Sequence, residues 1–186
     1  MSLSLQLGLT YFISELLLTV TRRSRSPTGT KQDRSTLGVL WVVILASVTA
    51  GVYAAAHWRA AALPNGQLLT VTGVILFVAG LILRWWAIIT LGRFFTVDVT
   101  IEKDHELVEL GPFRVLRHPS YTGVLLAFFG YALTLHNWAA LLVTVVPIFA
   151  AFIRRINVEE EALSNALGSR YADYMMRTKR LVPLIY

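Results

Sequence analysis

Two stretches of the sequence carry side chains that could do chemistry, and both mix cations, carboxylates and aromatic rings. The first is the run Arg117-His118-Pro119-Ser120-Tyr121. The second, further along the chain, contains Arg155, Glu159 and Glu160. Cysteine is absent, which excludes a thiol nucleophile, a thiolate zinc site and an Fe–S cluster. No metal-ligand spacing, phosphate-binding loop or nucleophile elbow appears either, so the residues predict a polar binding pocket without a metal.

The first stretch has the form of a helix start. Proline fits the first turn of a helix, so a helix should begin at Pro119, with His118 at its N-cap and Tyr121 one turn in. The free N–H groups and partial positive charge of such a start favour an anionic ligand group. The simpler alternative is that Arg-His-Pro only marks a helix start at a membrane boundary.

The second stretch belongs to an expected amphipathic helix over 154–177, which continues the last apolar segment. Its apolar stripe repeats at helical spacing and consists of Ile156, Leu163, Leu167, Tyr171 and Tyr174. At 100° per residue, Glu160 points toward this stripe, Glu159 lies at its edge and Glu161 faces solvent. Arg155 shares the face of Glu159, so a plain surface ion pair is the alternative reading.

The elements that must position these residues are transmembrane helices. The chain has 186 residues, of which 55% are hydrophobic and 15% charged, whereas a soluble domain carries about 25% charge. The mean hydropathy is +0.60. This composition excludes a disordered chain, a coiled coil and an ordinary cytosolic domain, and it indicates an all-α integral membrane protein.

Five apolar segments predict five transmembrane helices, at 3–20, 37–56, 67–89, 119–135 and 138–153. The last two are short for a bilayer core of about 30 Å and read as a tight hairpin around His136 and Asn137. Charges are scarce inside the segments, so Glu15 in the first either serves function or pairs with Arg84 in the third. We expect a single membrane domain over 1–186, with three spans in 1–89 and the binding half in 90–186.

The basic residues predict the orientation. All of the 17 lysines and arginines except Arg59 and Arg84 lie after the first, third and fifth segments. Cytoplasmic loops of membrane proteins collect positive charge, so the N-terminus should be outside and the C-terminus cytoplasmic. The first segment has no basic residues before it, which argues against a signal peptide. The net charge of +6 is thus an orientation signal, and no nucleic-acid partner is expected.

The motifs on the predicted cytoplasmic side resemble those of the isoprenylcysteine carboxyl methyltransferase family. The resemblance covers roughly 91–183, and the family also includes membrane phospholipid and small-thiol methyltransferases. It rests on His105-Glu-Leu107-Val108, on Gly111-Pro112-Phe113, on Arg117-His118-Pro119-Ser120-Tyr121-Thr-Gly123, and in the tail on Arg155, Glu159, Glu160, Leu163, Gly168, Tyr171, Tyr174, Arg180 and Pro183.

The resemblance implies a cytosolic S-adenosylmethionine pocket built from the C-terminal half. It carries cofactor binding onto His105, Leu107, Val108, Phe113, Arg117, His118, Tyr121, Glu159 and Glu160. It implies that Arg155 serves the acceptor, so Arg155 and Glu159 are the catalytic candidates. A further polar contact, typically glutamine in the family, falls at Asp98. The family usually has tyrosine where this chain has Phe113, which removes a hydroxyl.

The sequence therefore predicts an S-adenosylmethionine-dependent methyltransferase that acts on a lipophilic acceptor entering from the bilayer. The resemblance implies carboxyl O-methylation of an isoprenylcysteine-like acceptor. Methylation of another lipid, a phospholipid amine or a small thiol stays open. A non-catalytic lipid-binding membrane protein is the alternative from another class.

Overall fold

The computed structural model describes residues 2–22, 31–92, 107–183 and 185–186. Within these ranges the regular structure is helical throughout, as the sequence predicts. The elements, in chain order, are α1 (Leu3–Arg22), α2 (Lys31–His57), the short 3-10 helix η1 (Arg59–Ala61), α3 (Gly66–Leu91), the 3-10 helix η3 (Gly111–Arg114), α4 (Pro119–Leu133), α5 (Trp138–Leu167) and α6 (Ser169–Arg177).

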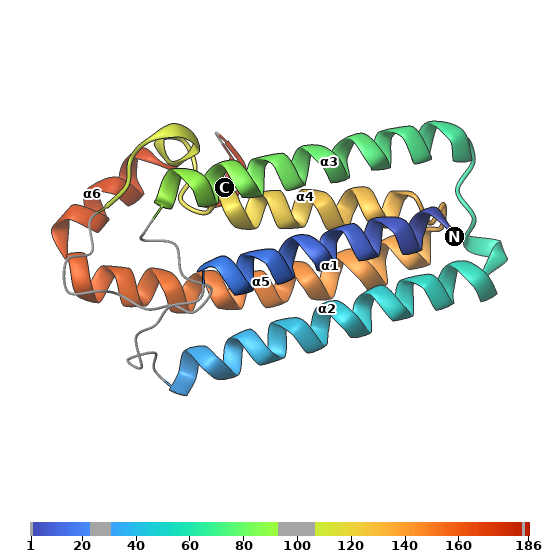
Figure 1. The fold of residues 1–186 in the computed structure, drawn as a ribbon, viewed down its shortest axis with the longest axis horizontal. Helices are drawn as coiled ribbons and strands as arrows, with labels where there is room; N and C mark the ends of the chain where they lie inside the picture. Colours follow the sequence, from blue (N-terminus) through green and yellow to red (C-terminus); the bar gives the residue numbers. More distant parts are fainter. Residues whose placement is uncertain (1, 23–30, 93–106, 184) are drawn as a thin grey trace.

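Helices α1 to α5 lie side by side along the long axis of the molecule, and each runs opposite to the one before it (Figure 1). Four of them, α1, α2, α3 and α5, are long and apolar enough to cross a membrane. Helix α4 begins at Pro119, as predicted, but has 15 residues and is shorter than the about 20 that a perpendicular crossing needs.

The α4–α5 connection forms the predicted tight hairpin. Helix α4 ends at Leu133, and the side chain of Asn137 caps α5 by accepting a hydrogen bond from the Ala140 N–H at 3.0 Å. The Asn137 amide also donates to the Trp58 carbonyl at 2.8 Å, which ties the hairpin to the end of α2.

Helices α3 and α4 pack against each other through facing glycines. Gly73 of α3 faces Gly130 of α4, and Gly80 faces Gly123. A Cβ atom on Gly73 would stand only 2.6 Å from the Gly130 carbonyl oxygen. The glycines of each helix are seven residues apart, so they share one face and let the two backbones approach closely.

The predicted tail helix is interrupted. Helix α5 ends at Leu167 and α6 begins at Ser169, because Gly168 has φ 55° and ψ −127°, a conformation that glycine adopts without steric cost. The expectation of one continuous helix over 154–177 is therefore wrong at this residue. The predicted apolar stripe nevertheless continues across the break, since Tyr171 and Tyr174 are both buried.

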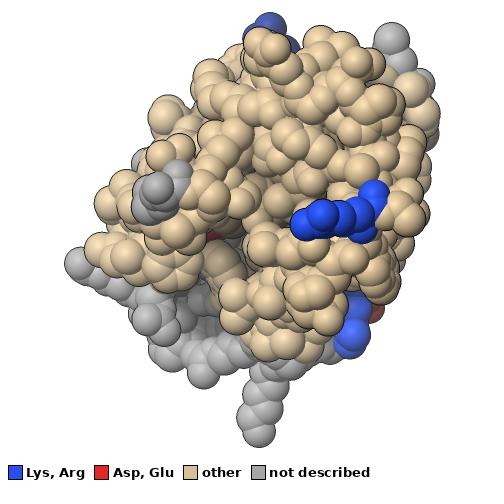
Figure 2. Space-filling view, turned by 90° about the vertical axis from the view of Figure 1, so that its right-hand side faces the viewer, with Lys and Arg blue, Asp and Glu red and all other residues tan. Residues whose placement is uncertain are grey.

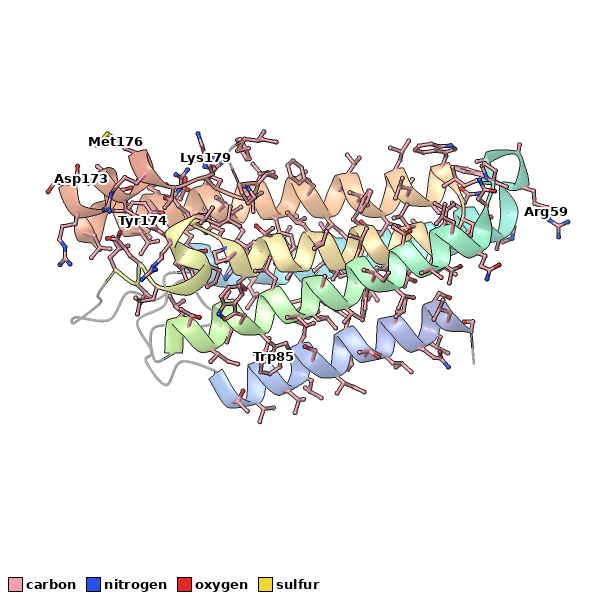
Figure 3. All side chains as sticks on the ribbon, turned by 90° about the horizontal axis from the view of Figure 1, so that it is seen from above. Arg59, Trp85, Asp173, Tyr174, Met176 and Lys179 are labelled. Atoms are coloured by element: carbon pink, nitrogen blue, oxygen red, sulfur yellow. The ribbon has the colours of Figure 1, made fainter. Side chains whose placement is uncertain are left out.

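The two ends of the bundle differ in charge. Figure 2 looks onto the end formed by η1 and the α4–α5 hairpin, and few charged atoms appear there among the described residues. Figure 3 shows Arg59 projecting from this end, whereas Asp173 and Lys179 lie at the opposite end. The chemistry-bearing stretches picked out in the sequence therefore lie at the charged end.

Candidate active site

The backbone brings the two motif stretches together. After η3, the N–H groups of Arg117 and His118 donate to the carbonyls of Lys179 and Arg180 at 2.7 and 3.1 Å. The Lys179 N–H donates in turn to the Val115 carbonyl at 3.0 Å. The residues after α6 therefore lie directly beside the segment that leads into α4, although the two are far apart in sequence.

A buried tyrosine reinforces this junction. The Tyr174 hydroxyl donates to the Phe113 carbonyl at 2.7 Å, which joins α6 to η3. Burial, and secondarily the charge of Glu109, raises the pKa of Tyr174, so its phenol stays a neutral donor. Burial likewise raises the pKa of Tyr171. Tyr174 is visible at this end in Figure 3.

Glu160 is the centre of the charged cluster. One carboxylate oxygen, Oε1, accepts hydrogen bonds from Arg117 Nε at 2.9 Å and from His118 Nε2 at 3.2 Å. The other oxygen, Oε2, accepts from Arg180 Nη2. Because three donors surround a carboxylate that is only 6% exposed, its ionised form is strongly stabilised. The angular spacing along the helix predicts that Glu160 points inward, and its burial confirms this prediction.

Arg117 has further partners in the tail. Its Nη1 donates to the Met175 carbonyl at 3.0 Å and to the Thr178 carbonyl at 2.7 Å. The guanidinium therefore fastens the end of α6 to the start of α4. This anchoring adds to the ion pair between Arg117 and Glu160.

A second network links the two helices through Tyr121. The Tyr121 hydroxyl donates to Glu159 Oε2 at 2.6 Å and accepts from Arg155 Nε at 3.0 Å. Its ring lies parallel to the ring of His118, with centroids 5.6 Å apart and planes inclined by 10°. Arg155 is 4% exposed, so the surface-pair reading of Arg155 and Glu159 is wrong.

The two glutamates thus have different surroundings. Glu160 accepts hydrogen bonds from three side chains, whereas the side chain of Glu159 remains 28% exposed beside His118, with its Oε2 3.9 Å from His118 Nδ1. Glu161 faces solvent, as its angular position on the helix predicts. Of the two carboxylates, Glu159 is therefore the more accessible one.

The remaining predicted site residues are placed only in part. Phe113 is buried in η3, next to the junction with α6. Leu107 and Val108 are half-buried and lie outside the polar network. His105 and Asp98 fall outside the described residues.

A small pocket of about 50 Å³ adjoins this network at Tyr121 and Arg155. It is lined by polar groups from four helices, by Phe152 of α5 and by apolar residues of α2; the polar residues are Tyr11, Glu15, Arg84, Tyr121 and Arg155, and those of α2 are Leu37, Leu40, Trp41 and Ile44. The sequence alone did not point to Tyr11, and it left the roles of Glu15 and Arg84 open. Their signal was the scarcity of ionisable residues inside apolar segments.

A larger cavity of about 350 Å³ adjoins the small pocket, because Tyr11, Trp41 and Ile44 line both. Its other walls are apolar side chains of α1, α2, α3 and α4: Leu7, Phe12, Val42, Leu45, Val48, Phe77, Phe128 and Tyr131, with Gly8. Phe12, Val42 and Leu45 are also exposed on the outside of the bundle. The cavity therefore reaches from the polar network toward the lipid-facing surface.

The fold and the site together define a multi-pass integral membrane protein. A small polar pocket and an adjoining apolar cavity lie beside the charged cluster at one end of its bundle. The family model for phospholipid methyltransferases matches residues 68–170. The chain belongs to this family, and the matched region contains the α4 motif and both glutamates.

Similar proteins carry more specific names. The chain is 36% identical to protein-S-isoprenylcysteine O-methyltransferase B of Arabidopsis thaliana over 115 residues, 61% of this chain and 58% of the relative. It is 33% identical to the protein-S-isoprenylcysteine O-methyltransferase of Saccharomyces cerevisiae over 121 residues, 64% of this chain and 51% of the relative. The resemblance drawn from the sequence is thereby confirmed.

The fold is similar to a solved one. The structure of the eukaryotic intramembrane Ras methyltransferase ICMT, isoprenylcysteine carboxyl methyltransferase, superposes with a TM-score of 0.59 at 27% identity. The match covers 87% of this chain and 54% of that chain. The chain thus spans about half the length of the relatives it matches.

Proposed function

We propose that this protein is an S-adenosylmethionine-dependent methyltransferase that methylates the carboxyl group of an isoprenylcysteine-like acceptor. The observation that carries the proposal is the hydroxyl of Tyr121. It joins Arg155 to Glu159 where a polar pocket opens into an apolar cavity. The names of the relatives support the same activity.

The donor set fits the cofactor. S-adenosylmethionine, when bound, supplies the methyl group, and it carries a carboxylate, an amino group and a ribose diol. The exposed part of Glu159 suits the diol or the amino group. His118, Arg117 and the start of α4 suit the cofactor carboxylate. Glu160 orients Arg117 and His118 through its hydrogen bonds, so its contribution to cofactor binding is indirect.

The apolar cavity suits the acceptor's lipid tail. A cavity of 150 Å³ holds a benzene-sized ligand, and about 350 Å³ leaves room for a considerably longer hydrocarbon. The tail would enter laterally from the bilayer between α1 and α2. Its reactive end would then lie in the small pocket beside Arg155 and Tyr121.

The chemistry needs no strong base for such an acceptor. A carboxylate is already ionised at neutral pH, so positioning, charge pairing and exclusion of water must supply the rate of an in-line displacement. Arg155, held by Tyr121, would orient the acceptor oxygen. An amine or phenol acceptor would require a group that takes its proton.

We also propose that α1 to α5 all cross the membrane, with the site at the cytoplasmic end and the N-terminus outside. The short helix α4 would cross together with its polar connection, shielded by α3 through the facing glycines. The basic residues at the site end and the near absence of charge at the other end support this orientation (Figure 2).

One competing acceptor has specific support. The matching family model is named for phospholipid methyltransferases, which favours a phospholipid amine. Labelled methyl transfer from S-adenosylmethionine should therefore be compared for N-acetyl-S-farnesylcysteine, its methyl ester and vesicles containing phosphatidylethanolamine. Labelling of N-acetyl-S-farnesylcysteine alone supports the proposal. Labelling of phosphatidylethanolamine alone would instead identify a phospholipid amine as the acceptor.

Calorimetry on detergent-solubilised protein tests cofactor binding separately. We expect S-adenosylhomocysteine to bind, Glu159→Ala to weaken this binding, and Arg155→Ala to impair mainly acceptor turnover. Glu161→Ala, on the solvent face of the same helix, is the matched control and should change neither. No binding at millimolar ligand would overturn the enzyme assignment in favour of a lipid-binding protein.

A further inference from the structure

A buried ion pair joins α1 to α3 inside the bundle. Arg84 Nε and Nη2 donate to the two carboxylate oxygens of Glu15, each at 2.6 Å. Glu15 is 7% exposed and Arg84 9% exposed. The sequence alternative that these two residues pair is confirmed by this geometry.

Packing alone gives little reason to keep such a pair. Bringing two charges into a low-dielectric bundle is costly, and apolar side chains of similar volume are often equally or more stabilising. The neighbouring contact between the same helices, Trp85 Nε1 to Ser14 Oγ at 2.8 Å, already ties α1 to α3. Figure 3 shows Trp85 on α3 at this junction.

The pair reaches the methyl-transfer site in two ways. The remaining terminal nitrogen of the guanidinium, Arg84 Nη1, donates to Ser120 Oγ at 3.0 Å, in the first turn of α4 and next to Tyr121. Glu15 and Arg84 also line the small pocket together with Tyr121 and Arg155. The pair is thus both a wall of the pocket and a link to the motif.

We propose that Glu15 is a positioning residue for acceptor methylation, an inference that rests on the function proposed above. Its carboxylate fixes the orientation of the Arg84 guanidinium. Arg84 in turn fixes the position of Ser120, and so the start of α4 and the neighbouring Tyr121, relative to the pocket. Glu15 therefore acts through Arg84 on the acceptor's reactive end. The cofactor groups assigned above, Glu159 and His118, do not contact the pair in the described structure.

The decisive variant removes both charges at once. Glu15→Ala would leave a buried cation and could simply unfold the protein, whereas Glu15→Leu with Arg84→Met replaces the pair by apolar volume. We expect this double variant to melt at or above the wild-type temperature and to bind S-adenosylhomocysteine as wild type does. Acceptor turnover should fall on the order of tenfold to a hundredfold, as expected for a loosened site.

Ser14→Ala is the matched control, because it removes the neighbouring α1–α3 hydrogen bond outside the pocket lining. It should keep wild-type turnover. Wild-type turnover in the double variant overturns the proposal, and so does an equal loss in Ser14→Ala, which would indicate a general effect of α1 docking.

If the double variant does not fold, Glu15→Gln decides, since it keeps the shape and one oxygen acceptor. Lower acceptor turnover with unchanged S-adenosylhomocysteine affinity supports the proposal, and unchanged turnover overturns it. A wild-type protein that binds S-adenosylhomocysteine but methylates none of the acceptors would instead overturn the proposed function, and this role of Glu15 with it.

Discussion

Replacing Glu160 by glutamine is the most direct test of the charged cluster. Glutamine keeps the size of the side chain and one carbonyl oxygen but removes the negative charge. In the structure the carboxylate accepts hydrogen bonds from Arg117 and His118 at Oε1 and from Arg180 at Oε2. The substitution therefore weakens three contacts that join α4, α5 and the segment after α6.

The size of the effect follows from the exposure of each partner. A hydrogen bond to a charged group contributes about 1.5–3 kcal/mol. The side chain of Arg180 is 27% exposed, so water can replace much of its lost hydrogen bond. The side chain of Arg117 is only 11% exposed, so water can replace little of the hydrogen bond that it loses. We expect Glu160→Gln to cost about 3 kcal/mol, roughly one full charge-assisted bond plus partial losses. For a chain of this length that corresponds to a lower Tm by about 6–12 °C.

Thermal unfolding in detergent measures this shift, and Glu161→Gln is the control. It makes the same chemical change one residue along, on the exposed face of α5, and should leave the Tm within about 2 °C, as expected of surface substitutions. If Glu160→Gln melts like this control, the cluster does not hold the tail in place, and our account of how the site is assembled is refuted.

Three further substitutions, one of them with a matched control, test other parts of the molecule. Tyr121→Phe removes the hydroxyl that links Arg155 to Glu159 but keeps the ring stack; acceptor methylation should fall about tenfold, and full activity would disprove the link. Gly123→Ala places a methyl group against the backbone of α3 and should cost about 1–3 kcal/mol by thermal unfolding. Gly38→Ala, where a Cβ meets nothing within 4 Å, should be neutral or stabilising by up to about 1 kcal/mol, and equal melting of the two variants would argue against close α3–α4 packing. Tyr174→Phe deletes a buried bond to the Phe113 carbonyl and should lower stability by about 1–2 kcal/mol; an unchanged Tm would show that the bond is dispensable.

Local geometry explains which parts could be predicted from the sequence. The direction of Glu160 follows from its angle on a helix, and that angle depends only on sequence spacing, so its burial was predictable. The start of α4 was predictable because Pro119 lacks an N–H and restricts the backbone before it. The five apolar helices follow from composition in the same way, although the length of α4 does not.

Features that depend on two elements meeting were harder to predict. Nothing in the spacing of Gly73 and Gly80 says which helix faces them, because a glycine stripe fits many partners. The choice of partner for Glu15 depended on the depth and rotation of α1 against α3. The apolar stripe continues past Gly168, so the sequence predicts a helix there, and only the backbone angles of Gly168 show the break.

The pairing of Arg117 and His118 with the backbone of Lys179 and Arg180 has a consequence for the order of folding. Helices α1 to α5 all precede residue 180 in the chain, so they can pack against one another before that residue has emerged. The contacts of residues 179 and 180 with Arg117, His118 and Glu160, however, form only once those residues arrive. Cofactor capture should therefore be the last step of folding, and a chain stopped before Arg180 would insert normally and remain inactive.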